Sequence, residues 1–437
     1  MPPTAAIILT LTTLAALLGA TSWAARSGHI AAETSRKIIH VGMGLICLSF
    51  PWLFQSTGPV QLLAAIAIVS LLLIRAPRLK KSVGHGLFAV SRISIGELLF
   101  PLAVAWIFTL SDGDPLLFTI PILQLTLADA AGAIVGTRIG KRLFKSSGGT
   151  KSFEGSLAFF LVALACAAIP LALHQDALPL VAIIAIPLLI ALFVTAVEGI
   201  SGHGLDNLLI PFGSWLLLDY YLELETAALL IRVVVLLAIA ALLTITARKS
   251  AFDGGALLAA ALFGFGAFTL GGLWCLIAAL LLFLLHLIIQ GHNKLTLDDK
   301  SSIGTLLAIA LPSLPWLTLA RSGQLTQPAA ATLFILTIAA LAAMIFSEAR
   351  RKKSHRYTAI LGAPVIGVLI ITTAIPLTNT PYQLFISLLP ITVASAIYYA
   401  YRNTFRTLTC GNDWAFLAAL ATLTTCINIP LLEIALS

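Results

Sequence analysis

Residues 178–198 read LPLVAIIAIPLLIALFVTAVE, an almost unbroken apolar stretch that ends in one carboxylate, Glu198. About 20 apolar residues are needed to cross a membrane as a helix, which pairs every backbone polar group internally. Similar stretches recur along all 437 residues, which are 59% hydrophobic and 10% charged, with a mean hydropathy of +1.03. A soluble domain carries roughly 25% charged residues. The sequence therefore predicts an all-α, polytopic transmembrane helical bundle.

The orientation of the spans follows from the basic residues in their connecting loops. We expect about 16 spans, at 4–25, 38–55, 58–75, 93–110, 115–136, 153–173, 178–198, 207–222, 226–247, 255–270, 272–291, 303–320, 328–347, 357–376, 382–401 and 413–434. With the N-terminus outside, all of the 26 Lys and Arg residues except Arg232 and Arg321 fall on the cytosolic side. Because loops rich in Lys and Arg stay in the cytosol, both termini are expected outside.

Cysteine and charge patterns exclude some classes of protein. The five cysteines lie in apolar stretches and form no C-x-x-C pair, so neither a disulfide framework nor a thiolate metal site is indicated. The formal net charge of +8 is spread over short loops between spans. Binding of nucleic acid needs a basic face on a soluble domain. A nucleic acid is therefore not an expected partner.

The acidic residues divide the chain into two halves. Most of the 18 Asp and Glu residues lie within residues 1–225, several of them at expected cytosolic helix ends. Carboxylates in or beside membrane spans are costly and usually functional. We therefore expect the chemistry in a first domain, residues 1–247, followed by a second transmembrane domain, residues 248–437.

Residues 129–155 read DAAGAIVGTRIGKRLFKSSGGTKSFEG and begin with a stripe of small residues. Asp129, Gly132, Gly136 and Gly140 are three or four apart, so they share one face of a helix. Missing side chains let another backbone or a ligand approach that face. Packing of two helices is thus one interpretation of the stripe, and a ligand site is the other.

The second part of this stretch favours a ligand. A flexible loop rich in Lys and Arg, which includes Lys141, is expected to lead to Lys151 and to a helix that starts at Ser152. Glu154 falls in the first turn of that helix, and Gly155 follows it. Backbone N–H groups at a helix N-terminus, together with basic side chains, form a cradle for a polyphosphate.

The stretch contains no G-x-x-x-x-G-K-[ST], so it is not a P-loop. It resembles the nucleotide-binding motif of the phytol kinase, dolichol kinase and CTP-dependent diacylglycerol kinase family: D-x-x-A-x-x-x-G-x-x-x-G, a basic loop, then K-[ST]-x-E-G. Gly132 stands where the family usually has Ala, and Thr150 stands where some members have a first Lys. The second difference removes a possible phosphate contact.

Three further segments resemble the same family in the expected order. They are RKIIH at 36–40 with Gly44, SIGELLFP at 94–101, and Glu198 followed by GLDNLLIP at 204–211. The expected topology, worked out without the family, places all of them at the cytosolic face, where nucleoside triphosphates are found. Together the matches cover residues 26–215.

Charge chemistry assigns roles to these residues. Mg²⁺ prefers carboxylate and phosphate oxygens, so Asp129, Glu198 and Asp206 are the candidate metal ligands. The candidate catalytic residues are Asp129, Lys151 and His40. The candidate nucleotide-binding residues are Arg36, Lys37, Gly136, Gly140, Lys141, Ser152, Glu154, Gly155 and Asn207, the last also as a neutral oxygen ligand.

Two of these assignments have alternatives. Arg36 and Lys37 either neutralise charge on the transferred phosphoryl group or anchor a helix end among lipid headgroups. His40 either accepts the proton of an alcohol or forms a hydrogen bond within the bundle.

The second half has a weaker resemblance. Residues 247–290 loosely resemble the opening of an integral membrane family that includes plant phytyl-phosphate kinases. Residues 342–348 read AAMIFSE, without the Asp that the later acidic motif of that family would imply. Residues 248–437 are therefore expected to be a degenerate or accessory domain.

The leading hypothesis is a lipid kinase with Mg²⁺ that transfers the γ-phosphoryl group of CTP, or of another nucleoside triphosphate such as ATP, to an isoprenoid alcohol such as phytol. It would be a multi-pass protein of the bacterial cytoplasmic membrane with a cytosol-facing site. Diacylglycerol and dolichol are alternative acceptors. A phosphatidate cytidylyltransferase is the second hypothesis, although those enzymes usually carry D-R near Asp206-Asn207. A secondary transporter would have two related halves, and the unequal distribution of acidic residues between the halves of this chain opposes that hypothesis.

Overall fold

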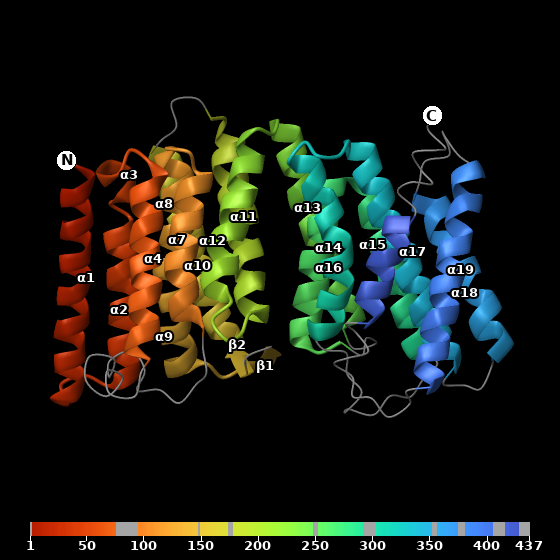
Figure 1. Cartoon of the computed structure of the whole chain (residues 1–437), viewed down its shortest axis with the longest axis horizontal. Helices are drawn as coiled ribbons and strands as arrows, with labels where there is room; N and C mark the ends of the chain where they lie inside the picture. Colours follow the sequence, from red (N-terminus) through yellow and green to blue (C-terminus); the bar gives the residue numbers. More distant parts are fainter. Residues whose placement is uncertain are drawn as a thin grey trace. The chain divides into compact units, whose positions relative to one another are not determined.

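The computed structural model describes residues 2–75, 95–146, 149–173, 178–247, 252–291, 303–351, 356–374, 381–404 and 416–427. In this part of the chain nearly all regular structure is helical, as expected (Figure 1). The sheet found there is a single two-stranded hairpin. Contacts divide the chain into two compact units, residues 1–234 and 235–437. The division falls inside helix α13 (Thr226–Thr246), which ends next to the expected domain boundary.

The first unit contains the hairpin and the helices around it. Its elements are α1 (Pro3–Arg26), α2 (Ala32–Cys47), α3 (Phe50–Leu53), α4 (Thr57–Ile74), α7 (Gly96–Leu110), α8 (Pro115–Leu123), the π-helical turn η1 (Gln124–Ala128), α9 (Asp129–Ile139), β1 (Leu143–Ser146), β2 (Gly149–Ser152), α10 (Phe153–Leu173), α11 (Leu180–Ile200), α12 (Asp206–Leu222) and the first part of α13.

The second unit is helical throughout its described residues. Its elements are the larger, second part of α13, α14 (Gly254–Gly271), α15 (Leu273–Gly291), α16 (Ile303–Arg321), α17 (Gln327–Arg351), α18 (Arg356–Ala374), α19 (Pro381–Thr404) and a helix over Phe416–Ile427.

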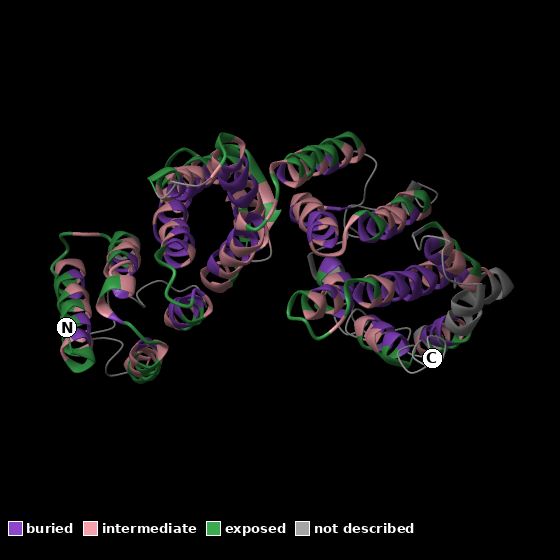
Figure 2. Ribbon diagram, turned by 90° about the horizontal axis from the view of Figure 1, so that it is seen from above, coloured by how far each residue is buried: buried purple, intermediate pink, exposed green. Residues whose placement is uncertain are grey.

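Eight of the described helices are long and apolar enough to cross a membrane, which supports the expected polytopic bundle. The expected number of about 16 spans and the orientation of the termini stay predictions. Buried faces turn toward neighbouring helices and exposed faces turn outward (Figure 2). In the first unit only 11% of α4 is buried, whereas the most apolar 18 residues are 56% buried in Pro115–Ile139 and 50% buried in α11. The helices that carry Asp129 and Glu198 are thus its inner ones.

The expected span 38–55 is wrong in its boundaries. Helix α2 begins earlier, at Ala32, and ends at Cys47, and the short α3 follows from Phe50. Pro51 explains the interruption, because proline has no N–H to donate and its ring clashes with the preceding turn. Proline is tolerated in the first turn of a helix, where α3 places it.

The fold predicts which loops lie on opposite sides of the membrane. Leu205 and Glu225 are exposed residues that flank α12, a helix of 17 residues and therefore about 25 Å long. In a background with all five cysteines replaced by Ala, Leu205→Cys should react with an impermeant thiol reagent from the cytosolic side of sealed membranes, and Glu225→Cys from the other side. Reaction of both from one side would contradict the spanning assignment of α12.

Candidate active site at one end of the first unit

Five polar residues of the expected site come from five different elements of the first unit. His40 lies in α2, Asp129 begins α9, Lys151 lies in β2, Glu198 is in the last turn of α11, and Asp206 begins α12. The loop between α11 and α12 is short, so Glu198 and Asp206 lie at the same end of these helices. The convergence expected from the alternating spans is therefore present in the structure.

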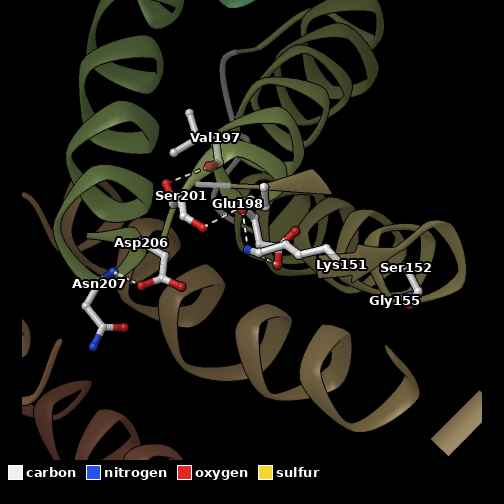
Figure 3. A network of polar contacts seen from close by, with 9 residues as sticks. Lys151, Ser152, Gly155, Val197, Glu198, Ser201, Asp206 and Asn207 are labelled. Atoms are coloured by element: carbon white, nitrogen blue, oxygen red, sulfur yellow. Dashed lines mark hydrogen bonds and ion pairs between the residues drawn. The ribbon is translucent and has the colours of Figure 1, made fainter. Parts of the chain in front are cut away.

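Lys151 and Glu198 form an ion pair. Lys151 Nζ lies 2.6 Å from Glu198 Oε1 and also donates to the backbone carbonyl of Glu198 (Figure 3). The two side chains are only 19% and 14% exposed. Glu198 Oε2 is buried and finds no hydrogen-bond partner among the described residues. One carboxylate oxygen thus compensates the lysine, and the other remains available to a cation or a donor.

The segment that carries Lys151 is a hairpin, where the sequence led us to expect a flexible loop. Strands β1 and β2 are antiparallel, with Phe144 opposite Lys151. Ser146 Oγ in β1 donates to the carbonyl of Ser201, just after α11, at 3.2 Å. The hairpin is therefore attached to the end of α11 by both strands, and this attachment fixes the position of the lysine.

Backbone contacts join the start of α7 to the start of α12. Ile95 N–H donates to the carbonyl of His203 at 3.0 Å, and Asn207 Nδ2 donates to the carbonyl of Gly96 at 2.8 Å. Asn207 N–H also lies 3.1 Å from Asp206 Oδ1. Asn207 therefore holds two motif segments together through its amide nitrogen, while its expected role as an oxygen ligand stays a prediction.

Three carboxylates share this end of the unit. Asp129 lies within electrostatic range of both Glu198 and Asp206, and Asp206 also interacts with Lys151 and His40. His40 Nε2 is 3.6 Å from Asp129 Oδ2. Among the described residues, however, no three His, Cys, Asp or Glu side chains converge closely enough to form a ready-made metal site. The expected set of three metal ligands is brought near but not assembled.

The glycine stripe is a helix-packing surface. A Cβ on Gly155 would lie 2.9 Å from the carbonyl oxygen of Gly132 and 3.0 Å from Gly136 Cα. A Cβ on Gly136 would meet Ser152 Oγ at 3.2 Å, and one on Gly140 would overlap the carbonyl of Gly136. The missing side chains thus let the backbones of α9 and α10 approach each other. Direct contact of these glycines with a nucleotide stays a prediction.

Glu154 and Ser152 accept hydrogen bonds from backbone N–H groups on either side of the hairpin. Glu154 Oε2 accepts the backbone N–H groups of Lys141 at 3.0 Å and of Arg142 at 3.2 Å. Ser152 is buried, and its Oγ accepts from the N–H of Gly155 at 3.2 Å. The N–H groups at the start of α10 were expected to bind phosphate, but in this structure the Ser152 side chain accepts from one of them, that of Gly155.

The remaining basic candidates lie around the site. Arg36 is exposed and Lys37 half-buried in α2, one turn before His40. Lys141 is exposed where α9 passes into the hairpin. Their contacts with phosphate stay predictions, and Arg36 and Lys37 keep the alternative role of headgroup anchors.

Two features of the site were missed by sequence reasoning. Gln124 is fully buried, and its Nε2 donates to the carbonyl of Ala163 at 3.0 Å. An amide inside an apolar span, five residues before Asp129, was a readable signal. Arg75 Nη2 lies 2.5 Å from Glu97 Oε1, which ties the end of α4 to the start of α7. The partner of Glu97 could not be read from the sequence, because the two residues are far apart along the chain.

The described residues define a helical membrane protein with a lysine and carboxylate site at one end of its first unit. The chain is 31% identical over 190 residues to a phytol kinase of Synechocystis sp., and this match covers 43% of the chain and 78% of that relative. No family model matches the chain, and no solved structure matches it. The chain belongs to the phytol kinase family.

Substitution of Gly155 should test the packing role of the stripe. Gly155→Val forces side-chain atoms against the backbone of α9, and such overpacking costs about 1 to 3 kcal/mol. We expect a lower melting temperature in detergent. The control is Gly19→Val in α1, where a Cβ meets nothing within 4 Å. Equal melting shifts for both variants, or a loss of nucleotide affinity without a loss of stability in Gly155→Val, would contradict the packing role.

Proposed function

We propose that this chain is a lipid-alcohol kinase that transfers the γ-phosphoryl group of CTP to an isoprenoid alcohol such as phytol, at the end of the first unit that carries Lys151. The observation that supports this most directly is the pairing of a largely buried lysine with one of three neighbouring carboxylates. Membership in the phytol kinase family supports the same reaction class.

Charge balance explains why these residue types suit phosphoryl transfer. The site has more carboxylates than cations in its immediate contacts, so by itself it would repel a triphosphate. With a divalent cation held by these carboxylates the balance would be reversed, and Lys151 would then be left to face phosphate oxygens. Electrostatic stabilisation and positioning supply most of the catalysis in phosphoryl transfer.

The donor set fits Mg²⁺. Mg²⁺ at a nucleotide site is usually held by one or two carboxylates together with phosphates and water, so a preformed cluster of three ligands is not required. Glu198 Oε2, which has no hydrogen-bond partner among the described residues, and the carboxylates of Asp129 and Asp206 are oxygen donors of the required kind. Bound there, Mg²⁺ would neutralise the triphosphate and orient the group to be transferred.

The ion pair gives Lys151 and Glu198 linked roles. In the absence of nucleotide, Glu198 compensates the lysine. We propose that Lys151 binds the transferred phosphoryl group during turnover, and that the Glu198 carboxylate then turns from Lys151 to where Mg²⁺ would be held. Each charge thus keeps a partner of opposite sign throughout, which avoids the cost of several kcal/mol for an isolated buried ion.

The orientation and the second domain complete the proposal. We propose that the site faces the cytosol of a bacterial cytoplasmic membrane, where nucleoside triphosphates are available. We further propose that residues 248–437 form an accessory domain without a second active site.

An assay with purified full-length protein tests the reaction. Radiolabelled CTP, ATP and UTP are each combined with phytol, a polyprenol and diacylglycerol, with Mg²⁺ or with EDTA. We expect label in the lipid phase with CTP and phytol, and its loss with EDTA. Formation of a CDP-lipid from phosphatidate, without transfer of the γ-phosphate to any alcohol, would instead favour a cytidylyltransferase.

Reversal of the ion pair separates a catalytic role from a structural one. Lys151→Ala and Glu198→Gln should each lower kcat/KM by about a hundredfold or more, since each 1.36 kcal/mol of lost stabilisation is about tenfold in rate. Lys151→Glu combined with Glu198→Lys should remain inactive, because the positive charge would then lie on α11 and not on strand β2.

The control for these variants is Glu225→Gln, a carboxylate at the far end of α12, which should retain activity. If the salt bridge were merely structural, the reversed pair would restore the ion pair and with it the activity. Recovery of both folding and turnover in that double variant would overturn the catalytic assignment.

A further inference from the structure

Helices α8 and α9 form one continuous helical rod, Pro115–Ile139, and a single π turn interrupts it just before Asp129. The turn covers Gln124–Ala128, and Asp129 follows with ordinary helical angles of φ −60° and ψ −45°. In a π turn the backbone hydrogen bonds reach five residues back, which disturbs the regular ladder and frees a carbonyl group. Such turns occur frequently at functional sites. The carbonyl groups of this turn are therefore suited to a contact outside the rod.

His40 makes this contact. Its Nε2 lies 3.0 Å from the carbonyl oxygen of Leu125, inside the π turn, and 3.6 Å from Asp129 Oδ2. A carbonyl oxygen and an ionised carboxylate can only accept hydrogen bonds. His40 Nε2 must therefore carry the hydrogen and donate it to Leu125. His40 Nε2 is therefore occupied by this hydrogen bond and is not available to take a proton from a substrate.

The surroundings of His40 hold its ring in this direction. The ring of Phe100, from α7, meets the imidazole edge to face, with centroids 5.3 Å apart. One turn after His40, on the same face of α2, Gly44 lies directly against the side chain of Thr126 in the π turn. Any larger residue at Gly44 would push α2 away from the π turn. His40 and Gly44, four residues apart, therefore lie on the one face of α2 that packs against the π turn.

We propose that His40 is a positioning residue that acts through Asp129. Its Nε2–H bond to Leu125 holds the π turn, and thereby sets where the Asp129 carboxylate lies for phosphoryl transfer. This inference rests on the proposed kinase function and deepens it. It also assigns a function to the π turn, which the sequence alone did not indicate.

Three substitutions in the full-length protein distinguish the possible roles of His40. In His40→Gln the amide nitrogen takes the place of Nε2 and can still donate to Leu125. In His40→Asn the amide is too short to reach the carbonyl, and His40→Leu has no donor. We expect His40→Gln to keep kcat within about fivefold of wild type. The Asn and Leu variants should lose about 30-fold or more, with KM for the alcohol little changed, because small misplacements of a reacting group are costly.

Any one of three other results with these variants would overturn the proposal. Gln, Asn and Leu variants that are equally inactive, with wild-type melting temperatures, would show that His40 takes the alcohol proton itself. A His40→Leu variant as active as wild type would show that the residue only fills space. An additional loss on combining His40→Leu with Asp129→Asn, equal to the product of the two single effects, would show that His40 does not act through Asp129.

A second measurement does not depend on activity. Amide hydrogen exchange reports local opening of backbone hydrogen bonds. We expect faster exchange over residues 124–130 in His40→Leu than in wild type, and wild-type exchange in His40→Gln. Absence of phosphoryl transfer by the wild-type protein would refute the proposed function, and these exchange rates would still test the link between His40 and the π turn. Unchanged exchange in His40→Leu would refute that link.

Discussion

The ion pair between Lys151 and Glu198 is the contact on which the arrangement of the site depends. It joins the hairpin to the last turn of α11, and α12 with Asp206 starts only a few residues later. It also places one positive charge among three carboxylates that would otherwise repel one another. A lone charge at this depth would cost several kcal/mol, so each partner makes burial of the other possible.

Close packing of two helices brings this ion pair about. The backbones of α9 and α10 meet at Gly136 and Gly155 without intervening side chains, and the hairpin connects the two helices across this contact. Glu154 then accepts from the backbone where the chain leaves α9. The residues of the motif thus shape the segment that presents Lys151, and this structural role accounts for their spacing even before any ligand is considered.

Hydropathy predicted that the described part of the chain is helical, and alternation of the expected spans predicted that Glu198 and Asp206 share one end. The stretch at 178–198 became α11, Leu180–Ile200, with Glu198 in its last turn. Pairings between distant residues could not be predicted, because nothing local encodes them: neither the hairpin's attachment at Ser201 nor the contact of His40 with Leu125 leaves a pattern in the chain. Pro51 was a readable signal for the break after α2 and was overlooked.

The π turn also changes how the two parts of one rod face their neighbours. One extra residue in a helical turn rotates everything beyond it by about 100°. Accordingly α8 packs against α12, α10, α7 and α2, whereas α9 packs almost entirely against α10, with a small contact to α2. Loss of a single residue between 124 and 128 would therefore turn the Gly132 face away from α10 while leaving the hydropathy of the span unchanged. Alignments that keep this span free of gaps would misplace Asp129 in any relative that lacks the extra residue.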